Sequence, residues 1–495
     1  MKATKDLREY LSVLEAAGEL KRIQAQVDWN QEAGAISRLA CEKREAAPLF
    51  ENIKDYPGHR MGAVLLGPGR PLHARIALAL GQEDKHIPPL KLIEIVRERF
   101  KSPRRPVEVE AKKAPCKEVI IPGDRANLLS FPIPQIKALD CGRYIGTWDI
   151  VVLKDLDSNW VNWGIYRCMV KDERNFTVLL LPAFQAGVPL LNQHGGAIFG
   201  KYEAAKKPMP VALVIGANPA CHFAAMTSFD YGVSEEEMAG GLYGSGVPLV
   251  KCETSDLMVP ADAELVVEAE VLPGVRVDEG PFGEYTGHVA HRGQAPLARV
   301  TCITHRRDPI FTMANMGKPY DDCATPRTIL HSALVKNRLE RNGIAVKSVY
   351  YPGTTLAPII AVKPAPAVHQ KIISTLLTAQ RLLRTGIVFV DEDVDVTDLE
   401  DLWWAITTRM HPKSYRTVDG VAAESLMPFL TPEERQNGES SVWVMNATIP
   451  YSWPEKFRAD HAATCDYESA WSPEVRQRVE RRWAEYGYGN GSGGR

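Results

Sequence analysis

The stretch LVVEAEV, residues 265–271, is a short run rich in β-branched residues, which is typical of a β-strand. Similar runs recur from Cys116 to about His305, and Gly, Pro and Asp residues separate them. Many short strands divided by turn residues predict a β-barrel or a β-sandwich, interrupted by one helix at 234–240. The other expected strands lie at 119–122, 149–153, 176–181, 211–215 and 299–304.

The segment before this β-rich region has a helical pattern instead. Leu7, Leu11 and Leu14 predict an amphipathic helix that closes near Gly18. The Pro-containing segment 101–106 breaks the pattern, so residues 1–110 are predicted to form a small α/β domain. Its other expected elements are helices at 33–41 and 90–100 and a strand at 63–66 that runs into a turn.

The pattern changes again after Gly317, where residues 319–440 are predicted to form a second α/β domain. Thr325-Pro326 predicts a helix start, because proline suits the first helical position, and Gly343 predicts its end. The remaining residues, 441–495, are expected to be an aromatic-rich tail with a short helix and a disordered Gly-rich end. The elements expected here are strands at 348–351, 358–362 and 387–390 and helices at 366–381 and about 473–484.

The composition excludes several classes of protein. The chain has 495 residues, 45% of them hydrophobic and 24% charged, with a formal net charge of −2. The lack of a basic excess argues against a nucleic-acid partner, and the apolar runs are too short to cross a membrane. The first residues lack an apolar signal core, and nine scattered cysteines include no Cys-x-x-Cys pair. We therefore expect a cytoplasmic protein with reduced thiols.

The stretch DEGPFGEYTG, residues 278–287, contains the most informative acidic pair. Glu279 and Glu284 lie five positions apart around Gly-Pro-Phe-Gly. The insert excludes a regular helix, and a strand would separate the two side chains, whereas a turn brings both into one cleft. Two close carboxylates repel, so one tends to retain a proton, and the pair can then supply an acid and a base. The alternative, which the local pattern alone favours, is a surface turn with two solvated glutamates.

The stretch NWGIYR, residues 162–167, is a second candidate site segment. Gly164 would let a ligand approach the backbone, and Arg167 could bind a carboxylate through two parallel hydrogen bonds. The alternative is a strand whose arginine pairs with a nearby acid, which is favoured when the stretch is taken in isolation.

His194 and Glu235 suggest a metal site when they are considered with Asn162. A neutral imidazole with carboxylate and amide oxygens suits Mn²⁺ or Mg²⁺. The three residues are far apart in the chain, however, and their spacing gives no reason to join them. The sequence has no phosphate-binding P-loop, no His-Glu-x-x-His and no Gly-x-Ser-x-Gly motif. The residues alone therefore predict a multi-domain α/β enzyme with acid/base chemistry.

Taken together, these stretches resemble the UbiD family of decarboxylases, which use prenylated flavin mononucleotide (prenylated FMN). The pairing of Asn-Trp-x-x-x-Arg at 162–167 with Glu-Gly-Pro-Phe-Gly-Glu at 279–284 is specific, and both occur in this order. The resemblance covers most of the chain. The other matching segments are 7–20, 27–28, 47–53, 132–134, 140–145, 252–260 and 404–409.

The resemblance implies an α+β, multi-domain fold. It implies a central split β-barrel at 111–318 that binds the flavin, and a C-terminal α/β domain that mediates oligomerisation, giving a homo-oligomer (dimer or hexamer). A flavin prenyltransferase would supply the cofactor.

The resemblance also implies residue roles. Carried over by motif, the catalytic network is Arg167, Glu279 and Glu284, and the ligands of a Mn²⁺-type ion on the cofactor phosphate are Asn162, His194 and Glu235. Further cofactor contacts are Gly164, Ile165, Tyr166, Arg167 and Gln193, and a K⁺ ion would bind carbonyls near Ala224, Ala225 and Thr227, together with Glu235. Family members often use a C-terminal lysine on the phosphate, but no lysine lies between Lys371 and Lys413. Arg381 and Arg384 are the candidates to replace it.

The implied reaction is reversible, non-oxidative decarboxylation of an aromatic, heteroaromatic or α,β-unsaturated carboxylic acid. Glu284 would deliver the proton that replaces CO₂, while Glu279 would hold Arg167 in place. One hypothesis is that the residues after Glu284 recognise a second polar group, such as a second carboxylate; a basic surface loop is an equal alternative. The residues in question are His288, His291, Arg292 and Arg299.

Two other functions remain open at this point. A flavin reductase-type oxidoreductase can also use a split barrel, but hydride transfer has no evident need of an Arg-Glu-Glu set. A non-catalytic assembly subunit would be favoured by loss of Glu279 or Glu284, and both are present.

Overall fold

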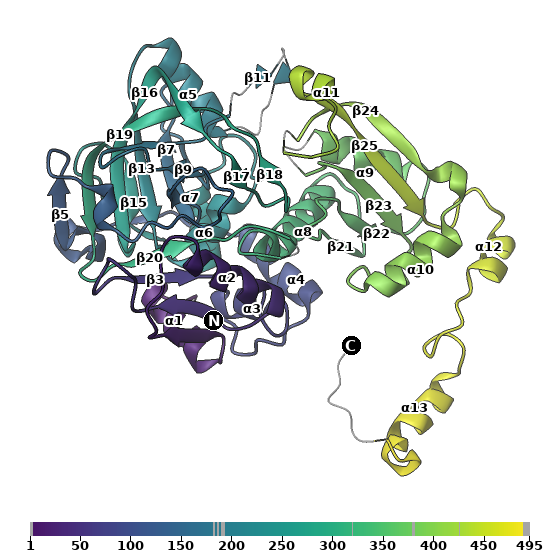
Figure 1. The fold of residues 1–495 in the computed structure, drawn as a ribbon. Helices are drawn as coiled ribbons and strands as arrows, with labels where there is room; N and C mark the ends of the chain where they lie inside the picture. The colour runs from purple at the N-terminus through teal and green to yellow at the C-terminus, as the bar shows by residue number, and fades with distance from the viewer. Residues whose placement is uncertain are drawn as a thin grey trace.

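An antiparallel sheet in the middle of the chain is the largest sheet of the fold, as the β-branched runs predict (Figure 1). The strand order is β10-β19-β16-β13-β7-β8, and β5 also pairs with β19. Its strands are β5 (Val119–Pro122), β7 (Asp149–Lys154), β8 (Val161–Gly164), β10 (Asn175–Thr177), β13 (Met209–Ile215), β16 (Leu265–Glu279) and β19 (Gly293–His305). This computed structural model describes residues 3–181, 184–185, 188–189, 194–318, 320–378, 382–424 and 426–488.

The pairings of this sheet follow an open path, and no closed barrel is found among the described residues. β16 and β19 pair over much of their length, with register shifts between Glu268 and Ala269 and between Val271 and Arg276. Such irregularities bend a strand and increase its twist, so the two longest strands are not flat. The strand expected at 176–181 is shorter than predicted, because β10 ends at Thr177.

Three helices pack on this sheet and carry residues of the site. α5 (His194–Ala204) contacts β7, β8 and β16, α6 (Pro219–Met226) contacts β7 and β8, and α7 (Glu235–Tyr243) contacts β8. Only α7 lies where the sequence predicts a helix. Shorter strands surround the sheet: β6 (Tyr144–Gly146) with β9 (Cys168–Met169), β11 (Phe184–Gln185) with β12 (Val188–Pro189), β17 (Phe282–Gly283) with β18 (Val289–Ala290), and β4 (Val107–Glu108) with β14 (Pro248–Lys251) and β15 (Met258–Pro260).

The N-terminal unit is a four-stranded sheet with helices, as expected, but its last strand comes from beyond the central sheet. β20 (Ile310–Met313) pairs in parallel with β3 (Arg60–Ala63), so the chain returns to this unit after β19. The strand predicted at 63–66 ends at Ala63, because Val64 has φ +60° and begins a turn. The other elements are β1 (Leu20–Ile23), β2 (Ala47–Phe50), α1 (Leu7–Ala16), α2 (Glu32–Lys43), α3 (Ala74–Ala79) and α4 (Pro89–Phe100).

The C-terminal unit is a five-stranded sheet with the order β21-β22-β23-β25-β24. The expected boundary at residue 440 is wrong, because β25 (Glu439–Ala447) crosses it and pairs with both β23 and β24. The alternating Val442 and Val444 of β25 are buried in the core of this unit. The other elements are β21 (Ser348–Tyr350), β22 (Ile359–Ala361), β23 (Gly386–Val390), β24 (Arg416–Ala422), α8 (Ala324–Arg341), α9 (Val368–Leu377), α10 (Leu399–Arg409) and α11 (Pro432–Asn437).

Helix α8 connects the units, and it lies between the central sheet and the C-terminal sheet in Figure 1. It starts at Ala324, one residue before the predicted Thr325 start. The carboxylate of Asp321 caps this end by accepting from the backbone N–H groups of Cys323 (2.8 Å) and Ala324 (2.7 Å). The N-terminus of α8 is thereby held beside the central sheet, which matters for the site below.

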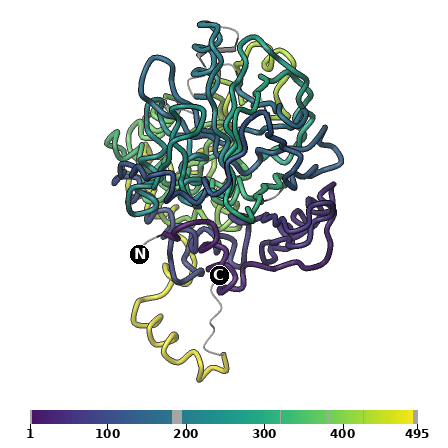
Figure 2. The backbone as a smooth tube through the Cα atoms, turned by 90° about the vertical axis from the view of Figure 1, so that its left-hand side faces the viewer, coloured from purple at the N-terminus to yellow at the C-terminus, as the bar shows by residue number. Residues whose placement is uncertain are grey.

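The tail leaves the body of the protein, as Figures 1 and 2 show. Its helices are α12 (Glu455–Ala462) and α13 (Pro473–Arg481), the second of which confirms the predicted helix, and neither has a buried residue. The predicted disordered end lies outside the described residues. Short 3-10 helices occupy Ala111–Lys113, Pro115–Lys117, Leu128–Ser130, Pro412–Ser414 and Trp483–Tyr486.

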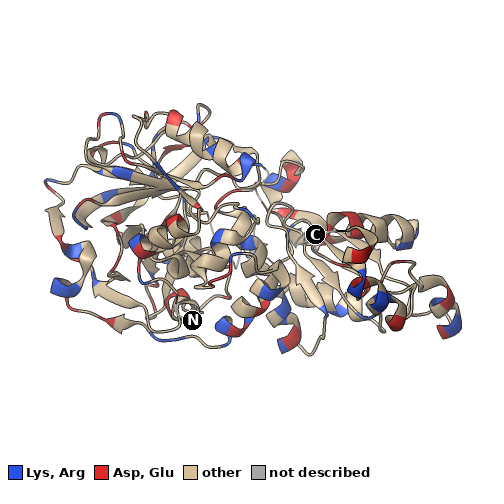
Figure 3. Cartoon of the chain, turned by 90° about the horizontal axis from the view of Figure 1, so that it is seen from below, with Lys and Arg blue, Asp and Glu red and all other residues tan. Residues whose placement is uncertain are grey.

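The distribution of charged residues and the length of the helices agree with the near-zero net charge and the short apolar runs of the sequence. Basic and acidic residues are interspersed over the view in Figure 3. Over the part of the chain that the structure describes, every helix is too short or too polar to cross a bilayer.

Candidate active site

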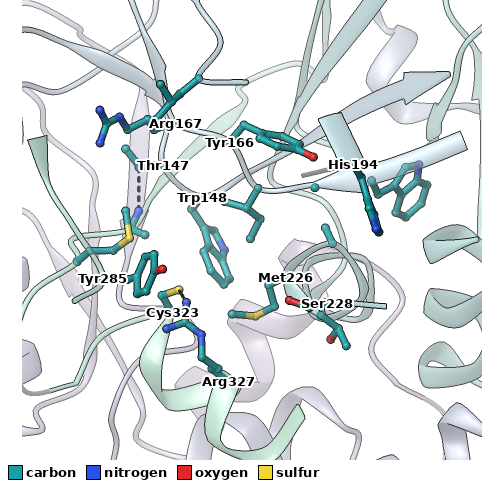
Figure 4. Close-up of a pocket in the computed structure, with 18 of the residues that line it drawn as sticks. Thr147, Trp148, Tyr166, Arg167, His194, Met226, Ser228, Tyr285, Cys323 and Arg327 are labelled. Carbon is teal, nitrogen blue, oxygen red and sulfur yellow. Dashed lines mark hydrogen bonds between the residues drawn. The ribbon is translucent and has the colours of Figure 1, made fainter. Parts of the chain in front are cut away.

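A cavity of about 230 Å³ lies where β8, the end of α6 and the start of α8 meet. Figure 4 shows Arg167 and His194 on opposite sides of it, with Trp148 between them and Tyr285, Cys323 and Arg327 below. Residues from the C-terminal unit complete the wall. The predicted residues that line it are Asn162, Gly164, Ile165, Tyr166, Arg167, His194, Ala225, Thr227, Glu235 and Glu284.

Arg167 joins the two predicted glutamates in one buried network. Its Nε and Nη2 donate to Glu279 Oε1 (2.9 Å) and Oε2 (2.5 Å), and its Nη1 donates to Glu284 Oε1 (2.5 Å). The Tyr144 hydroxyl donates a further hydrogen bond to Glu279 Oε1 (2.8 Å). The side chains that sequence reasoning placed in separate stretches therefore meet around one guanidinium.

The turn between the two glutamates explains this meeting. Glu279 ends β16, and Gly280 follows with φ +80°, a conformation that a side chain disfavours. Phe282 is buried, and the Gly283 N–H donates to Asp140 Oδ1 (2.9 Å), which fixes the return of the chain. Glu284 consequently points back toward Arg167. The alternative of two solvated glutamates is wrong, because both side chains are buried.

The two glutamates differ in how strongly their charged forms are stabilised. Glu279 accepts from two guanidinium nitrogens and from a phenol, whereas Glu284 accepts one guanidinium bond and a 3.3 Å bond from the Tyr285 N–H. Burial raises the pKa of Glu284 above its usual range, and the nearby Arg167 only partly opposes this. Burial acts to lower the pKa of Arg167, but Glu284 and Glu279 together raise it above its usual value. Burial therefore favours the neutral form of Glu284.

A second polar group, formed by Asn162, His194 and Glu235, lies on the opposite side of the cavity. Asn162 Nδ2 lies 3.1 Å from Glu235 Oε1 and 3.4 Å from His194 Nδ1, and the last two atoms are 3.8 Å apart. The Trp163 N–H donates to Glu235 Oε2 (3.2 Å). β8, α5 and α7 each contribute one residue, so the fold joins three residues that spacing could not.

This donor set fits a hard divalent cation. Burial raises the pKa of Glu235 above its usual range, and the hydrogen bond with His194 acts in the opposite direction. A half-turn of the Asn162 amide would direct its oxygen toward the other two side chains. Amide oxygen, imidazole nitrogen and carboxylate oxygen are suitable ligands for Mn²⁺ or Mg²⁺. No group of three His, Cys, Asp or Glu residues with metal-site geometry occurs in the described ranges, so this set depends on the asparagine.

The backbone carbonyls predicted for K⁺ lie at the C-terminal end of α6. Ala225 and Thr227 line the cavity, while the Ala224 carbonyl accepts from the Thr227 N–H (3.1 Å). The last carbonyls of a helix lack intrahelical donors and carry partial negative charge. They are therefore suited to a cation beside Glu235.

Gly164 has a different role from the expected one. A Cβ atom at this position would lie 2.4 Å from the Tyr166 ring, so the space above the glycine is filled by Tyr166 and not by a ligand. The Tyr166 hydroxyl in turn donates to Asn162 Oδ1 (3.1 Å) and accepts from the Gly195 N–H (3.0 Å). Tyr166 thus holds β8 against α5. Gln193 lies outside the described residues.

The structure does not bring the four basic residues after Glu284 to the cavity. All four are exposed, and none is among the described residues that line the wall. The hypothesis of a second polar-group site in this loop is therefore corrected, because these side chains are exposed to solvent away from the cavity wall. Arg299, for example, faces Glu270 across the β16–β19 pair, at 3.5 Å. The residues concerned are His288, His291, Arg292 and Arg299.

Several cavity residues were missed by sequence reasoning. Cys323 and Arg327 belong to the start of α8, and Tyr285 follows the catalytic turn. The sequence signal that could have found them is adjacency. Tyr285 directly follows Glu284, and Cys323 and Arg327 lie on either side of the predicted helix start at Thr325-Pro326. Arg384, named as a replacement for the absent lysine, does line the cavity, and its Nη1 donates to Tyr285 Oη and Glu424 Oε2, both at 3.0 Å. Arg381 is outside the described residues.

Comparison with known proteins supports one family over nearly the whole chain. Domain models of 3-octaprenyl-4-hydroxybenzoate carboxy-lyase match residues 11–90 (N-terminal domain), 107–319 (Rift-related domain) and 325–447 (C-terminal domain); these are the models of the UbiD family. The chain is 30% identical over 504 residues to pyrrole-2-carboxylic acid decarboxylase from Pseudomonas aeruginosa, covering 98% of this chain and 99% of that protein. It is 29% identical over 506 residues to ferulic acid decarboxylase 1 from Saccharomyces cerevisiae, covering 98% of each.

Solved structures are similar along their full length. Vanillic acid decarboxylase from Sedimentibacter hydroxybenzoicus, in its closed form, is 29% identical with a TM-score of 0.86, and the match covers 99% of this chain and all of that one. A dimeric form of the UbiD-class enzyme HmfF from Pelotomaculum thermopropionicum, solved with prenylated FMN, is 29% identical with a TM-score of 0.76, covering 91% of this chain and 96% of that one. The mixed α+β, multi-domain fold is thus shared with these enzymes.

Proposed function

The chain belongs to the UbiD family and is a prenylated-FMN-dependent decarboxylase, and from this premise we propose that it reversibly removes CO₂ from an aromatic, heteroaromatic or α,β-unsaturated carboxylic acid. The names of its relatives support an acid whose carboxylate is attached to an sp² carbon. The observation that carries the proposal is the buried network in which Arg167 holds Glu279 and Glu284 at a cavity wall.

The cofactor supplies the electron sink that loss of CO₂ from an sp² carbon requires. We propose that the phosphate of the cofactor binds on the side of Asn162, His194 and Glu235 through a divalent ion such as Mn²⁺. The carbonyls at the end of α6 would hold K⁺ next to it. The raised pKa of the buried Glu235 supports this assignment, because a cation would stabilise the charged carboxylate.

The chain's own residues orient the substrate and move the proton. Glu279 holds the guanidinium of Arg167 by two hydrogen bonds, which leaves Nη1 aimed at Glu284. Glu284, kept protonated by burial, would donate its proton to the carbon that has lost CO₂, and in the reverse direction it would accept that proton. The central sheet, in this proposal, is the flavin-binding platform of a split barrel.

The proposal excludes the two alternatives on specific grounds. An ordinary flavin reductase has no evident use for a buried Arg-Glu-Glu network, and a non-catalytic subunit has no reason to keep a protonated carboxyl at a cavity wall. We also propose a homo-oligomer, which is supported by the aromatic residues that the tail exposes, among them Trp453, Trp471 and Trp483.

The test uses the full chain co-expressed with a flavin prenyltransferase. Absorbance and mass spectrometry of the purified protein should detect prenylated FMN, and a panel of ring and acrylic acids should yield CO₂ from at least one class. In D₂O, the product should contain one deuterium on the carbon that carried the carboxylate. Cofactor-loaded protein that releases no CO₂ from any class, or that reduces a flavin instead, would overturn the proposal.

A further inference from the structure

Arg327 is a buried guanidinium at the cavity wall that has no carboxylate partner. Its residue is 6% exposed, and among the described residues no acidic oxygen lies within the 4.0 Å of an ion pair. Its Nη2 donates to Cys323 Sγ (2.8 Å), its Nη1 donates to the Gly353 carbonyl (3.4 Å), and it stacks over the Tyr285 ring at 4.3 Å. The backbone carbonyl and the aromatic ring carry no negative charge. The thiol is the one contact of the three that could carry one by ionising.

The Cys323 thiol does not supply the missing charge. Burial raises the pKa of this thiol to about 11, although Arg327 acts in the opposite direction. The thiol is therefore neutral near pH 7, and a neutral thiol is a weak acceptor. Within the part of the chain that the structure describes, the Arg327 guanidinium therefore has no anionic partner.

The other two arginines of the cavity are neutralised within the chain. Arg384 pairs with Glu424 at 3.0 Å, and Arg167 pairs with both Glu279 and Glu284. Arg327 is thus the one arginine of the cavity wall, among the described residues, that no carboxylate pairs with. A buried charge without a partner is strongly unfavourable, so its retention at a cavity wall points to an anion that arrives with a ligand.

The position of Arg327 defines where that anion would lie. Arg327 belongs to the first turn of α8, and Tyr285, over which it stacks, directly follows Glu284. The first N–H groups of α8 are already used by Asp321, so the guanidinium is the donor left for a ligand at this helix end. Figure 4 shows Arg327 on the lower wall, across the cavity from Arg167.

We propose that Arg327 binds a second carboxylate, remote from the one that is lost, so that the substrate is a dicarboxylic acid. This inference rests on the proposed decarboxylation and names its substrate class. A planar guanidinium forms two parallel hydrogen bonds with a carboxylate, which gives both affinity and orientation. The second carboxylate would anchor the distal end of the substrate while the reacting end lies near Glu284.

The experiment compares a monoacid with a diacid of the same skeleton on the holoenzyme. The first pair is cinnamate and 4-carboxycinnamate, with 4-hydroxycinnamate as the analogue that carries a neutral polar group. The second pair is pyrrole-2-carboxylate and pyrrole-2,5-dicarboxylate. Wild type, Arg327→Met and Arg327→Lys are assayed for kcat and KM. Binding of each acid to the catalytically silent FMN-loaded protein is measured by calorimetry, which gives a readout independent of turnover. Arg341→Met, an exposed change on the same helix, is the matched control.

We expect wild type to bind the diacid of at least one pair more tightly than its monoacid. Arg327→Met should weaken diacid binding and raise its KM by about 10- to 100-fold, the effect of losing a hydrogen-bonded charge, while changing the monoacid less than about threefold. Arg327→Lys should recover part of the diacid affinity, because it restores the charge without the bidentate geometry. Arg341→Met should change neither acid.

The contrary outcomes are distinct. If Arg327→Met loses affinity equally for the monoacid and the diacid, Arg327 binds the reacting carboxylate. If it loses affinity equally for the diacid and the hydroxy acid, Arg327 recognises a neutral polar group. Either result overturns the inference. So does a wild type that shows no diacid preference in either pair. Absence of CO₂ release from every acid, with normal diacid binding, would instead overturn the proposed decarboxylation. Thermal unfolding of each variant separates these results from a failure to fold.

Discussion

The two sides of the cavity differ in whether their buried charged side chains are paired within the chain. On one side, Arg167 is bonded to Glu279 and Glu284, so positive and negative groups are matched within the chain. On the other side, Glu235 is buried next to Asn162 and His194, and no lysine or arginine among the described residues pairs with it. The first arrangement is complete as the chain folds, whereas we propose that a cation completes the second.

This difference separates two kinds of functional geometry. A matched network orients its members before any ligand arrives, which is what a proton donor and its orienting groups require. An unmatched buried carboxylate is costly until a cation binds, and its free energy is then recovered as binding affinity. Mutations on the matched side should therefore affect the protein itself, and mutations on the other side should affect what it binds.

Replacement of the proton donor should have the largest effect. Glu284→Gln keeps the shape of the side chain and a hydrogen bond to Arg167 but removes the acidic proton. We expect kcat for CO₂ release to fall by about 10²- to 10⁴-fold, the usual contribution of general acid catalysis. Single-turnover kinetics of the holoenzyme measure the change, and Glu270→Gln on the exposed face of β16 is the control. Retention of normal turnover would remove Glu284 from the mechanism.

Breaking the matched network should destabilise the folded chain without any ligand. Glu279→Leu leaves Arg167 buried with Glu284 as its remaining partner, and burial favours the neutral form of Glu284. The free energy of unfolding should therefore fall by about 3–5 kcal/mol. Glu235→Leu, on the other side, removes a buried carboxylate that no described lysine or arginine pairs with, and the cofactor-free protein should be unaffected or more stable. Urea unfolding of both variants measures the contrast. Equal destabilisation would show that the two sides do not differ as we infer.

Cation binding should appear only on the unmatched side. Mn²⁺ at about one hundred times its dissociation constant should stabilise the wild-type protein by about 2.7 kcal/mol, because it binds the folded chain alone. Glu235→Gln or His194→Ala should abolish the rise in the unfolding temperature, whereas Glu279→Gln should keep it. Calorimetric titration with MnCl₂ is the measurement. Stabilisation that persists in Glu235→Gln would place the ion elsewhere.

The pH dependence should show the smallest effect. Because burial raises the pKa of Glu284, its proton is retained above the ordinary carboxyl range and is lost as the pH rises through the raised value. The rate of decarboxylation should therefore fall on the alkaline side, and the same group should contribute stability at low pH that is lost over this range. A kcat–pH profile of the holoenzyme tests the sign. A rate that instead increases as Glu284 ionises would contradict the assigned role.

The fold was predictable where local pattern and tertiary context agree. The β-branched runs at 211–215 and 265–271 are strands because they are buried on the sheet that they form, and α8 and α13 follow their turn and capping signals. The end of β3 at Ala63, the open path of the central sheet among the described residues and the strand that crosses residue 440 were not predictable. In each case a long-range pairing, such as that of β20 with β3 or β25 with β23, decides the outcome.

The sequence by itself determined which side chains were available: Glu279 and Glu284 around a turn, Arg167 after Asn-Trp-Gly, and a histidine and a glutamate far from both. Only the tertiary structure decided that Arg167 bonds both glutamates, that His194 approaches Glu235, and that the basic loop after Glu284 faces solvent while Arg327 faces the cavity. The physical reason is that a pattern in sequence reports neighbours within a few residues. Charge matching and desolvation depend on distances between elements that only the packed fold sets.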